Sequence, residues 1–195
     1  MKPALLTGAV LLMVCTLGVV ALRFTGYSLT GPVDTGCPPD VPTCVETVTA
    51  PAAREFTGPD GSVDDPTSRG RITQRMLHAD RQARRAIGRL PGGVRCWDEH
   101  AWNPSSDHPR GRACDYAVGT LGRFPRAGQQ REGWRLARWF QVNAEALGVR
   151  YIIWDGRIWS TWRSRDGWRG YDGAGVYDPR TPTGGHFDHV HVSVE

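Results

Sequence analysis

Apolar side chains recur at helical spacing in two stretches of the chain. The first stretch begins at Arg71 and carries arginines on its opposite face, and its apolar positions are Ile72, Met76, Ala79, Ala83, Ile87 and Leu90. The second lies within residues 131–148, where Gly148 supplies a stop, and its apolar positions are Trp134, Ala137, Phe140, Ala144 and Leu147. Because residues three and four apart share one face of a helix, both patterns predict amphipathic helices.

Shorter apolar runs predict strands in the second half of the chain. Residues 149–160 read VRYIIWDGRIWS, in which Asp155 and Gly156 form the dipeptide favoured in tight turns, so we expect a β-hairpin. Residues 114–118 and the closing HFDHVHVSVE also read as strands. Residues 161–185 are rich in glycine and aromatic residues and predict a loop, either a lid beside a substrate or a merely mobile connection. Helices combined with hairpins, without a βαβ rhythm, predict an α+β domain.

Three regions are expected along the chain. Residues 1–24 contain 20 consecutive uncharged residues from Pro3 to Leu22, about the length that spans a bilayer, and Lys2 places the preceding end inside the cell. We expect an uncleaved membrane anchor with an exported domain; the alternatives are a cleaved signal peptide and, less favoured, a lipoprotein modified at Cys15. Residues 25–70 are rich in Pro, Gly, Thr and Asp and predict a linker. Residues 71–195 then form the folded domain.

The charge of the chain argues against nucleic acid as a partner. The formal net charge is +4, and removing Lys2 and Arg23 with the N-terminal segment leaves +2, which is too small to indicate nucleic-acid binding. A mildly basic surface suits an anionic cell wall equally well.

Export changes the expected state of the cysteines. In an oxidising compartment, the four cysteines beyond the N-terminal segment are expected to form disulfides. Cys37 and Cys44 bracket a short loop that can be closed locally, which leaves Cys96 and Cys114 as the second pair. Four cysteines allow three pairings, so the others stay open.

Histidine and aspartate residues indicate a metal site. His189 and His191 are two apart, so in a strand both rings lie on one face while the intervening valines face the core. His108 and Asp115 lie upstream, with Gly111 allowing a turn between them. Two imidazoles and one carboxylate suit catalytic zinc with an open fourth position. The alternative is a strand that simply exposes its histidines to solvent.

Two motifs together resemble a known family. Ser106, His108, Gly111, Ala113 and Asp115 stand as SxHxxGxAxD, and a DHVH motif follows near residue 191. This combination resembles the zinc peptidases of the D-alanyl-D-alanine carboxypeptidase family, relatives of the lysostaphin and hedgehog fold group. The resemblance implies a small antiparallel sheet flanked by helices and zinc held by His108, Asp115 and His191. It also implies cleavage of peptidoglycan stem or cross-link peptides that contain D-amino acids.

The same resemblance suggests further roles. It places the general base at Asp188, where many relatives carry glutamate; a regular strand would turn Asp188 away from His191, and His189 is then the alternative as base or oxyanion stabiliser. Arg95 is the nearest match to an arginine that holds the substrate carboxylate or carbonyl. His78 and His100 are expected at the surface, and His186 lies near the site without an assigned role. The competing hypothesis is a cell-wall or partner-binding module that retains a zinc site.

Overall fold

The computed structural model describes residues 36–45 and 47–195. The expected membrane anchor or signal segment, residues 1–24, therefore lies outside the described residues. Among the helices that are described, none combines the length and the apolar character needed to cross a bilayer.

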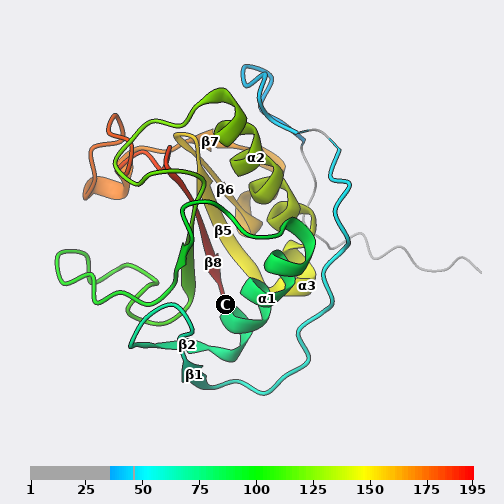
Figure 1. Ribbon diagram of the computed structural model, residues 1–195, viewed down its shortest axis with the longest axis vertical. Helices are drawn as coiled ribbons and strands as arrows, with labels where there is room; N and C mark the ends of the chain where they lie inside the picture. The colour runs from blue at the N-terminus through cyan, green and yellow to red at the C-terminus, as the bar shows by residue number, and fades with distance from the viewer. Residues whose placement is uncertain (1–35, 46) are drawn as a thin grey trace, which may run out of the picture. The chain divides into compact units, whose positions relative to one another are not determined.

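A six-stranded antiparallel sheet organises the domain, with the order β3-β4-β8-β5-β6-β7. Its strands are β3 (Val94–Arg95), β4 (Ala113–Ala117), β5 (Val149–Trp154), β6 (Arg157–Ser160), β7 (Arg169–Gly170) and β8 (His189–Val194). Strand β8 pairs with both β4 and β5 and so lies inside the sheet. Figure 1 shows α1, α2 and α3 on one side of this sheet and long connecting loops, coloured green and orange, on the other. The α+β prediction is confirmed.

The predicted hairpin forms as expected. Strands β5 and β6 pair antiparallel, with Trp154 opposite Arg157. Asp155 and Gly156 occupy the turn with φ values of 54° and 69°. Positive φ at both central residues is the requirement of a type I′ turn, which matches the twist of the strands it joins.

The predicted helices form with shifted boundaries. Helix α1 (Gln74–Ile87) begins three residues later than the apolar pattern, because β2 (Arg71–Thr73) pairs with β1 (Ser62–Asp64) in a separate two-stranded sheet. The Thr73 side chain caps α1 by accepting a hydrogen bond from the backbone N–H of Met76. The second predicted helix is divided at Asn143 into α2 (Ala127–Val142) and α3 (Ala144–Leu147).

The core lies between the helices and the sheet. Its largest members are four tryptophans with less than 2% exposure, namely Trp134, Trp139, Trp154 and Trp159. Helix α2 approaches β5 at Gly133, where a Cβ atom would lie 2.1 Å from Cζ2 of Trp154. This glycine therefore sets the distance between the helix layer and the sheet.

The residues before the first helix are packed on the domain rather than free of it. The backbone N–H of Ala53 donates to Oδ1 of Asn143 at 2.7 Å, and the indole N–H of Trp139 donates to the carbonyl of Pro51 at 2.8 Å. Apolar residues from this segment, among them Val41, Val48 and Val63, contact the core. The described part of the predicted linker over residues 25–70 thus contacts the folded domain, although its widely spaced apolar residues leave no periodic signal in the sequence.

Both expected disulfides are present. Cys37 is bonded to Cys44 in the region before the first helix, and Cys96 is bonded to Cys114. The second bond joins the residue after β3 to the interior of β4. It lies next to two of the residues that the sequence assigns to the metal site.

Candidate metal centre

Strand pairing brings the predicted metal ligands together. In the antiparallel pair of β4 and β8, Asp115 lies directly opposite His191, and Ala117 lies opposite His189. Residues that face each other across a pair share one side of the sheet. His108 enters from the loop that precedes β4. One potential ligand atom from each of His108, Asp115 and His191 lies within 4.8 Å of the other two, so these residues could hold a metal ion.

The distances suit a small divalent cation. Nε2 of His108 lies 3.2 Å from Oδ1 of Asp115 and 3.3 Å from Nδ1 of His191, and the last two atoms are 2.9 Å apart. Ligand atoms at zinc distances of about 2.0–2.2 Å lie roughly 3.3–3.6 Å apart in a tetrahedron. The triangle is therefore close to the size that zinc needs and requires only a small expansion.

Neighbouring groups orient both imidazoles. Nδ1 of His108 makes a close hydrogen bond to the carbonyl oxygen of Cys96, which makes Nδ1 the donor and leaves Nε2 for a metal. Nε2 of His191 lies 3.1 Å from Oγ of Ser193, which leaves Nδ1 for the same purpose. The Cys96–Cys114 disulfide thus fixes both the carbonyl that orients His108 and the strand that carries Asp115.

The electrostatic field of the site favours a cation. Burial would lower the pKa of His108, but the charge of Asp115 and its hydrogen bond outweigh burial and raise that pKa to about 9. Burial opposes ionisation of Asp115, yet His108 and His189 hold its pKa well below the usual value. Asp115 is therefore a carboxylate at neutral pH, and a metal ion would replace the proton that it keeps on His108.

Asp188 does not face the metal ligands. It precedes β8 and is 1% exposed. Its Oδ2 accepts hydrogen bonds from the backbone N–H of Gly122 at 2.6 Å and from the Thr183 hydroxyl at 2.7 Å, while Oδ1 lies 2.6 Å from Nδ1 of His189. Both oxygens are thus engaged away from the cavity.

His189 lies beside the metal ligands instead. Its Nε2 is 3.6 Å from Oδ1 of Asp115, and its ring lines the cavity above the site. Burial would lower its pKa, but the charges and hydrogen bonds of Asp115 and Asp188 raise it. Of the two residues proposed as base, His189 is the one in position to contact a substrate.

Arg95 lies on the edge strand β3, directly opposite Asp115 in the pairing with β4. Its exposed side chain starts from the same side of the sheet as the metal ligands. Arg95 is not among the described residues that line the cavity, and its side chain forms no hydrogen bond or ion pair with the residues that the structure describes.

Three further aromatic rings surround the ligands. His100 stacks on His108 with ring centroids 4.9 Å apart, and Tyr151 stacks on His191 at 5.4 Å. His186 is 7% exposed, and its ring lies 4.6 Å from that of His189. The expectation that His186 lies near the site is thus met, and its ring also lies 5.6 Å from that of His191. His100, expected at the surface, is half-buried against His108, and Tyr151 gave no signal beyond that of an ordinary strand residue.

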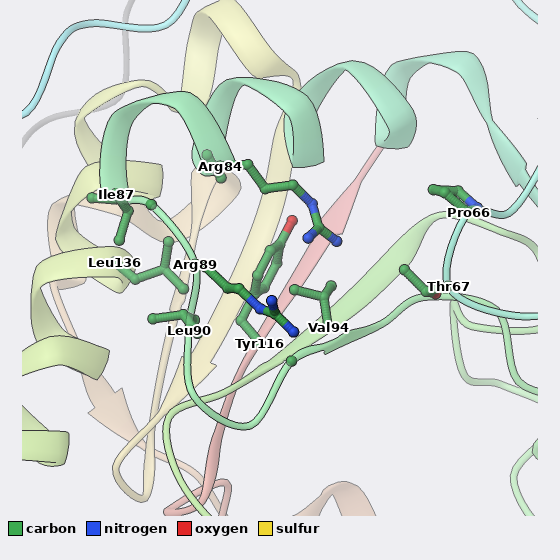
Figure 2. A pocket seen from close by; sticks show the side chains of 12 residues that line it. Pro66, Thr67, Arg84, Ile87, Arg89, Leu90, Val94, Tyr116 and Leu136 are labelled. Carbon is green, nitrogen blue, oxygen red and sulfur yellow. The ribbon is translucent and has the colours of Figure 1, made fainter.

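The structure has cavities on both sides of the sheet. The metal ligands open into one of 330 Å³ that is lined mainly by aromatic and imidazole rings. A second cavity, of 410 Å³, lies on the helix side, where the guanidinium groups of Arg84 and Arg89 lie near Tyr116 (Figure 2). Because consecutive strand residues face opposite sides of a sheet, Asp115 lines the first cavity and its neighbour Tyr116 lines the second. Only the first cavity contains the metal ligands.

Comparison with known proteins identifies a family. The family model described as VldE, C-terminal domain, matches residues 68–182, a range that includes His108 and Asp115 and ends before β8. No curated protein and no solved structure matches the chain. Since the matched residues make up more than half of the sequence, the chain belongs to the VldE C-terminal domain family.

Proposed function

We propose that the protein is an exported zinc peptidase that hydrolyses peptidoglycan peptides containing D-amino acids. The observation that carries this proposal is the group of His108, Asp115 and His191, which opens into a cavity with His189 beside it. Two imidazoles and a carboxylate are a ligand set of catalytic zinc sites, in which a fourth position stays open. The sequence resemblance to D-alanyl-D-alanine carboxypeptidase-like enzymes supplies the fold type and the substrate class.

His189 and Asp188 divide the acid–base work in this proposal. Zinc in such a site supplies Lewis-acid chemistry that activates water and polarises a peptide carbonyl. Asp188 accepts the Nδ1 proton of His189 and thereby leaves Nε2 free to take a proton from the attacking water. The same imidazole then returns that proton to the departing amine. Asp188 is accordingly a positioning residue rather than the base.

Arg95 is proposed to contact the substrate carbonyl or carboxylate from the edge strand. Its place opposite Asp115 puts its backbone next to the metal ligands, and its guanidinium is not committed to another described residue. Replacing Arg95 with alanine should raise KM without changing zinc content.

Export is proposed for the domain, with an N-terminal anchor or a cleaved signal. The two disulfides support this location, because such bonds persist in oxidising compartments. Peptidoglycan lies in the same compartment in bacteria, so location and substrate agree.

The test is a hydrolysis assay on the full chain with its disulfides formed. Zinc-loaded protein is incubated with purified peptidoglycan fragments, and the products are identified by mass spectrometry with and without a chelator. Asp115→Asn should lose stoichiometric zinc and hydrolysis together, whereas Asp64→Asn, whose side chain is 93% exposed, should retain both. Equal activity in the two variants would refute the site.

A binding module is the second candidate. The observation that favours it is the engagement of both Asp188 oxygens, which leaves no carboxylate facing the cavity other than Asp115 among the lining residues that the structure describes. Sedimentation with insoluble peptidoglycan, combined with no product under any metal condition, would support binding without cleavage.

A further inference from the structure

Two series of aromatic rings in contact with one another lead away from the metal ligands. In the first, which we name the Trp102 arm, His108 stacks on His100, and His100 lies 4.9 Å from Trp102. In the second, the Trp162 arm, His191 stacks on Tyr151, and Tyr151 lies 6.3 Å from Trp162. Each arm ends in a tryptophan that lines the cavity and remains 65% or 61% exposed, respectively. Tryptophan is highly buried on average and is enriched at binding interfaces, so two exposed tryptophans that line one cavity favour contact with a ligand.

The two arms come from opposite ends of the strand order, on either side of the central strand β8. Trp102 and His108 belong to the connection between β3 and β4, whereas Trp162 follows β6. In the strand order, β8 with His191 lies between those two regions. A substrate that contacts both tryptophans therefore extends to both sides of the metal ligands.

The described lining of the cavity offers no lysine or arginine side chain to pair with a free carboxylate. Of the guanidinium groups nearby, that of Arg110 donates to the carbonyls of Ser105 and Ser106, and that of Arg150 pairs with Asp107. Arg95 stands outside the lining on β3. Apart from the carboxylate of Asp115, the polar groups that line the cavity are mainly hydroxyls, an amide and imidazoles, which suit an uncharged polymer segment.

We infer that the site cleaves an internal peptide bond, as an endopeptidase acting on cross-linked peptides rather than a carboxypeptidase that removes one terminal residue. This inference rests on the proposed function. The substrate contacts the Trp102 arm on one side of the scissile bond and the Trp162 arm on the other. Water adds its oxygen to the carbonyl carbon, the C–N bond breaks, and the amine leaves with a proton. Both new ends, a carboxylate and an amine, belong to longer chains.

The experiment compares two substrates under identical conditions with the full, zinc-loaded chain. One is a cross-linked muropeptide dimer with amidated carboxyl ends, and the other is a linear stem peptide with a free C-terminal D-alanine. We expect kcat/KM to be at least about tenfold higher for the dimer. Trp102→Ala and Trp162→Ala should each raise KM for the dimer by roughly five- to tenfold with little change in kcat. Phe124→Ala is the matched control, because Phe124 is 59% exposed but does not line this cavity.

The outcomes separate this inference from the proposed function. Removal of the terminal D-alanine at a higher kcat/KM than dimer cleavage would overturn the inference and leave the peptidase intact. Wild-type KM in both tryptophan variants would also overturn it. Hydrolysis of neither substrate by folded, zinc-loaded protein would instead refute the proposed function itself.

Discussion

Replacing Asp188 with asparagine tests the division of work between Asp188 and His189. Oδ2 of Asp188 accepts two hydrogen bonds, from Gly122 and Thr183, and Oδ1 faces Nδ1 of His189. In asparagine, the amide oxygen would take the place of Oδ2 and keep the hydrogen bonds from Gly122 and Thr183. The opposite orientation of the amide would place its NH₂ group against the backbone N–H of Gly122, and two donors cannot bond to each other. In the first orientation, the NH₂ group would donate to Nδ1 of His189. The imidazole would carry its proton on Nε2 and could no longer accept one from water.

The size of the effect follows from that tautomer change. A misplaced proton on the general base costs on the order of 10²- to 10⁴-fold in kcat, or about 2.7–5.5 kcal/mol in activation free energy. Loss of the charged acceptor should also lower the free energy of unfolding by about 1.5–3 kcal/mol. KM and zinc content should stay near the wild-type values, because Asp188 contacts neither the metal ligands nor the cavity.

The assay measures kcat and KM on the cleaved peptide, zinc content by elemental analysis, and urea unfolding, for Asp188→Asn and His189→Gln side by side. Both variants should lose kcat to a similar extent. Wild-type kcat in His189→Gln, together with a large loss in Asp188→Asn, would refute the reasoning and identify Asp188 itself as the base. Wild-type kcat in both would remove this pair from the mechanism.

Three further predictions concern stability and metal affinity. Replacing Cys96 and Cys114 with serine should lower the free energy of unfolding by about 2–4 kcal/mol. The same change should weaken zinc binding, measured by competition with a chelator, whereas loss of the Cys37–Cys44 bond should leave zinc affinity unchanged. Asp65→Asn should cost about 2 kcal/mol at neutral pH, because Thr67, Ser68 and Trp97 donate to the Asp65 carboxylate. Burial of Asp65 raises its pKa, but these hydrogen bonds outweigh burial and lower the pKa below 3.8. The Asp65 carboxylate therefore stabilises the fold above about pH 4, and this stabilisation is lost as the pH falls through the folded-state pKa. Acid unfolding curves below pH 4 should therefore be steeper for the wild type than for the variant. Gly133→Ala should destabilise by about 1–3 kcal/mol through contact with Trp154, whereas Gly128→Ala on the same helix, with its nearest atom 4.0 Å away, should be neutral or slightly stabilising in thermal unfolding.

Much of the fold, and the three residues that could hold a metal ion, could be predicted because the deciding signals are local. Periodic apolar residues determine α1 and α2, and the Asp155-Gly156 dipeptide determines the hairpin. Spacing within β8 places the rings of His189 and His191 on one side. The order of the two histidine-containing motifs, combined with the resemblance, points to His108, Asp115 and His191, which the fold brings together as a group that could hold a metal ion.

The remaining features depend on tertiary contacts that leave no local pattern. The segment before α1 packs through isolated apolar residues and through backbone groups such as the N–H of Ala53, neither of which is periodic. The orientation of Asp188 is set by Gly122, 66 residues away in sequence. Tyr151 is an ordinary strand residue until the fold places it against His191.

The central place of β8 has a consequence for how the protein is made. Within the described residues β8 is the last strand in chain order, yet it fills the gap between β4 and β5. Ribosomes deliver a chain from its N-terminal end, so β4 and β5 emerge with unpaired edges and wait for a strand that arrives several seconds later, at about 5–20 residues per second. The hairpins β3–β4 and β5–β6 can pair early, but the two halves of the sheet can join only after β8 has been made. Any factor that holds the nascent chain unfolded during this interval would protect it from pairing with another copy.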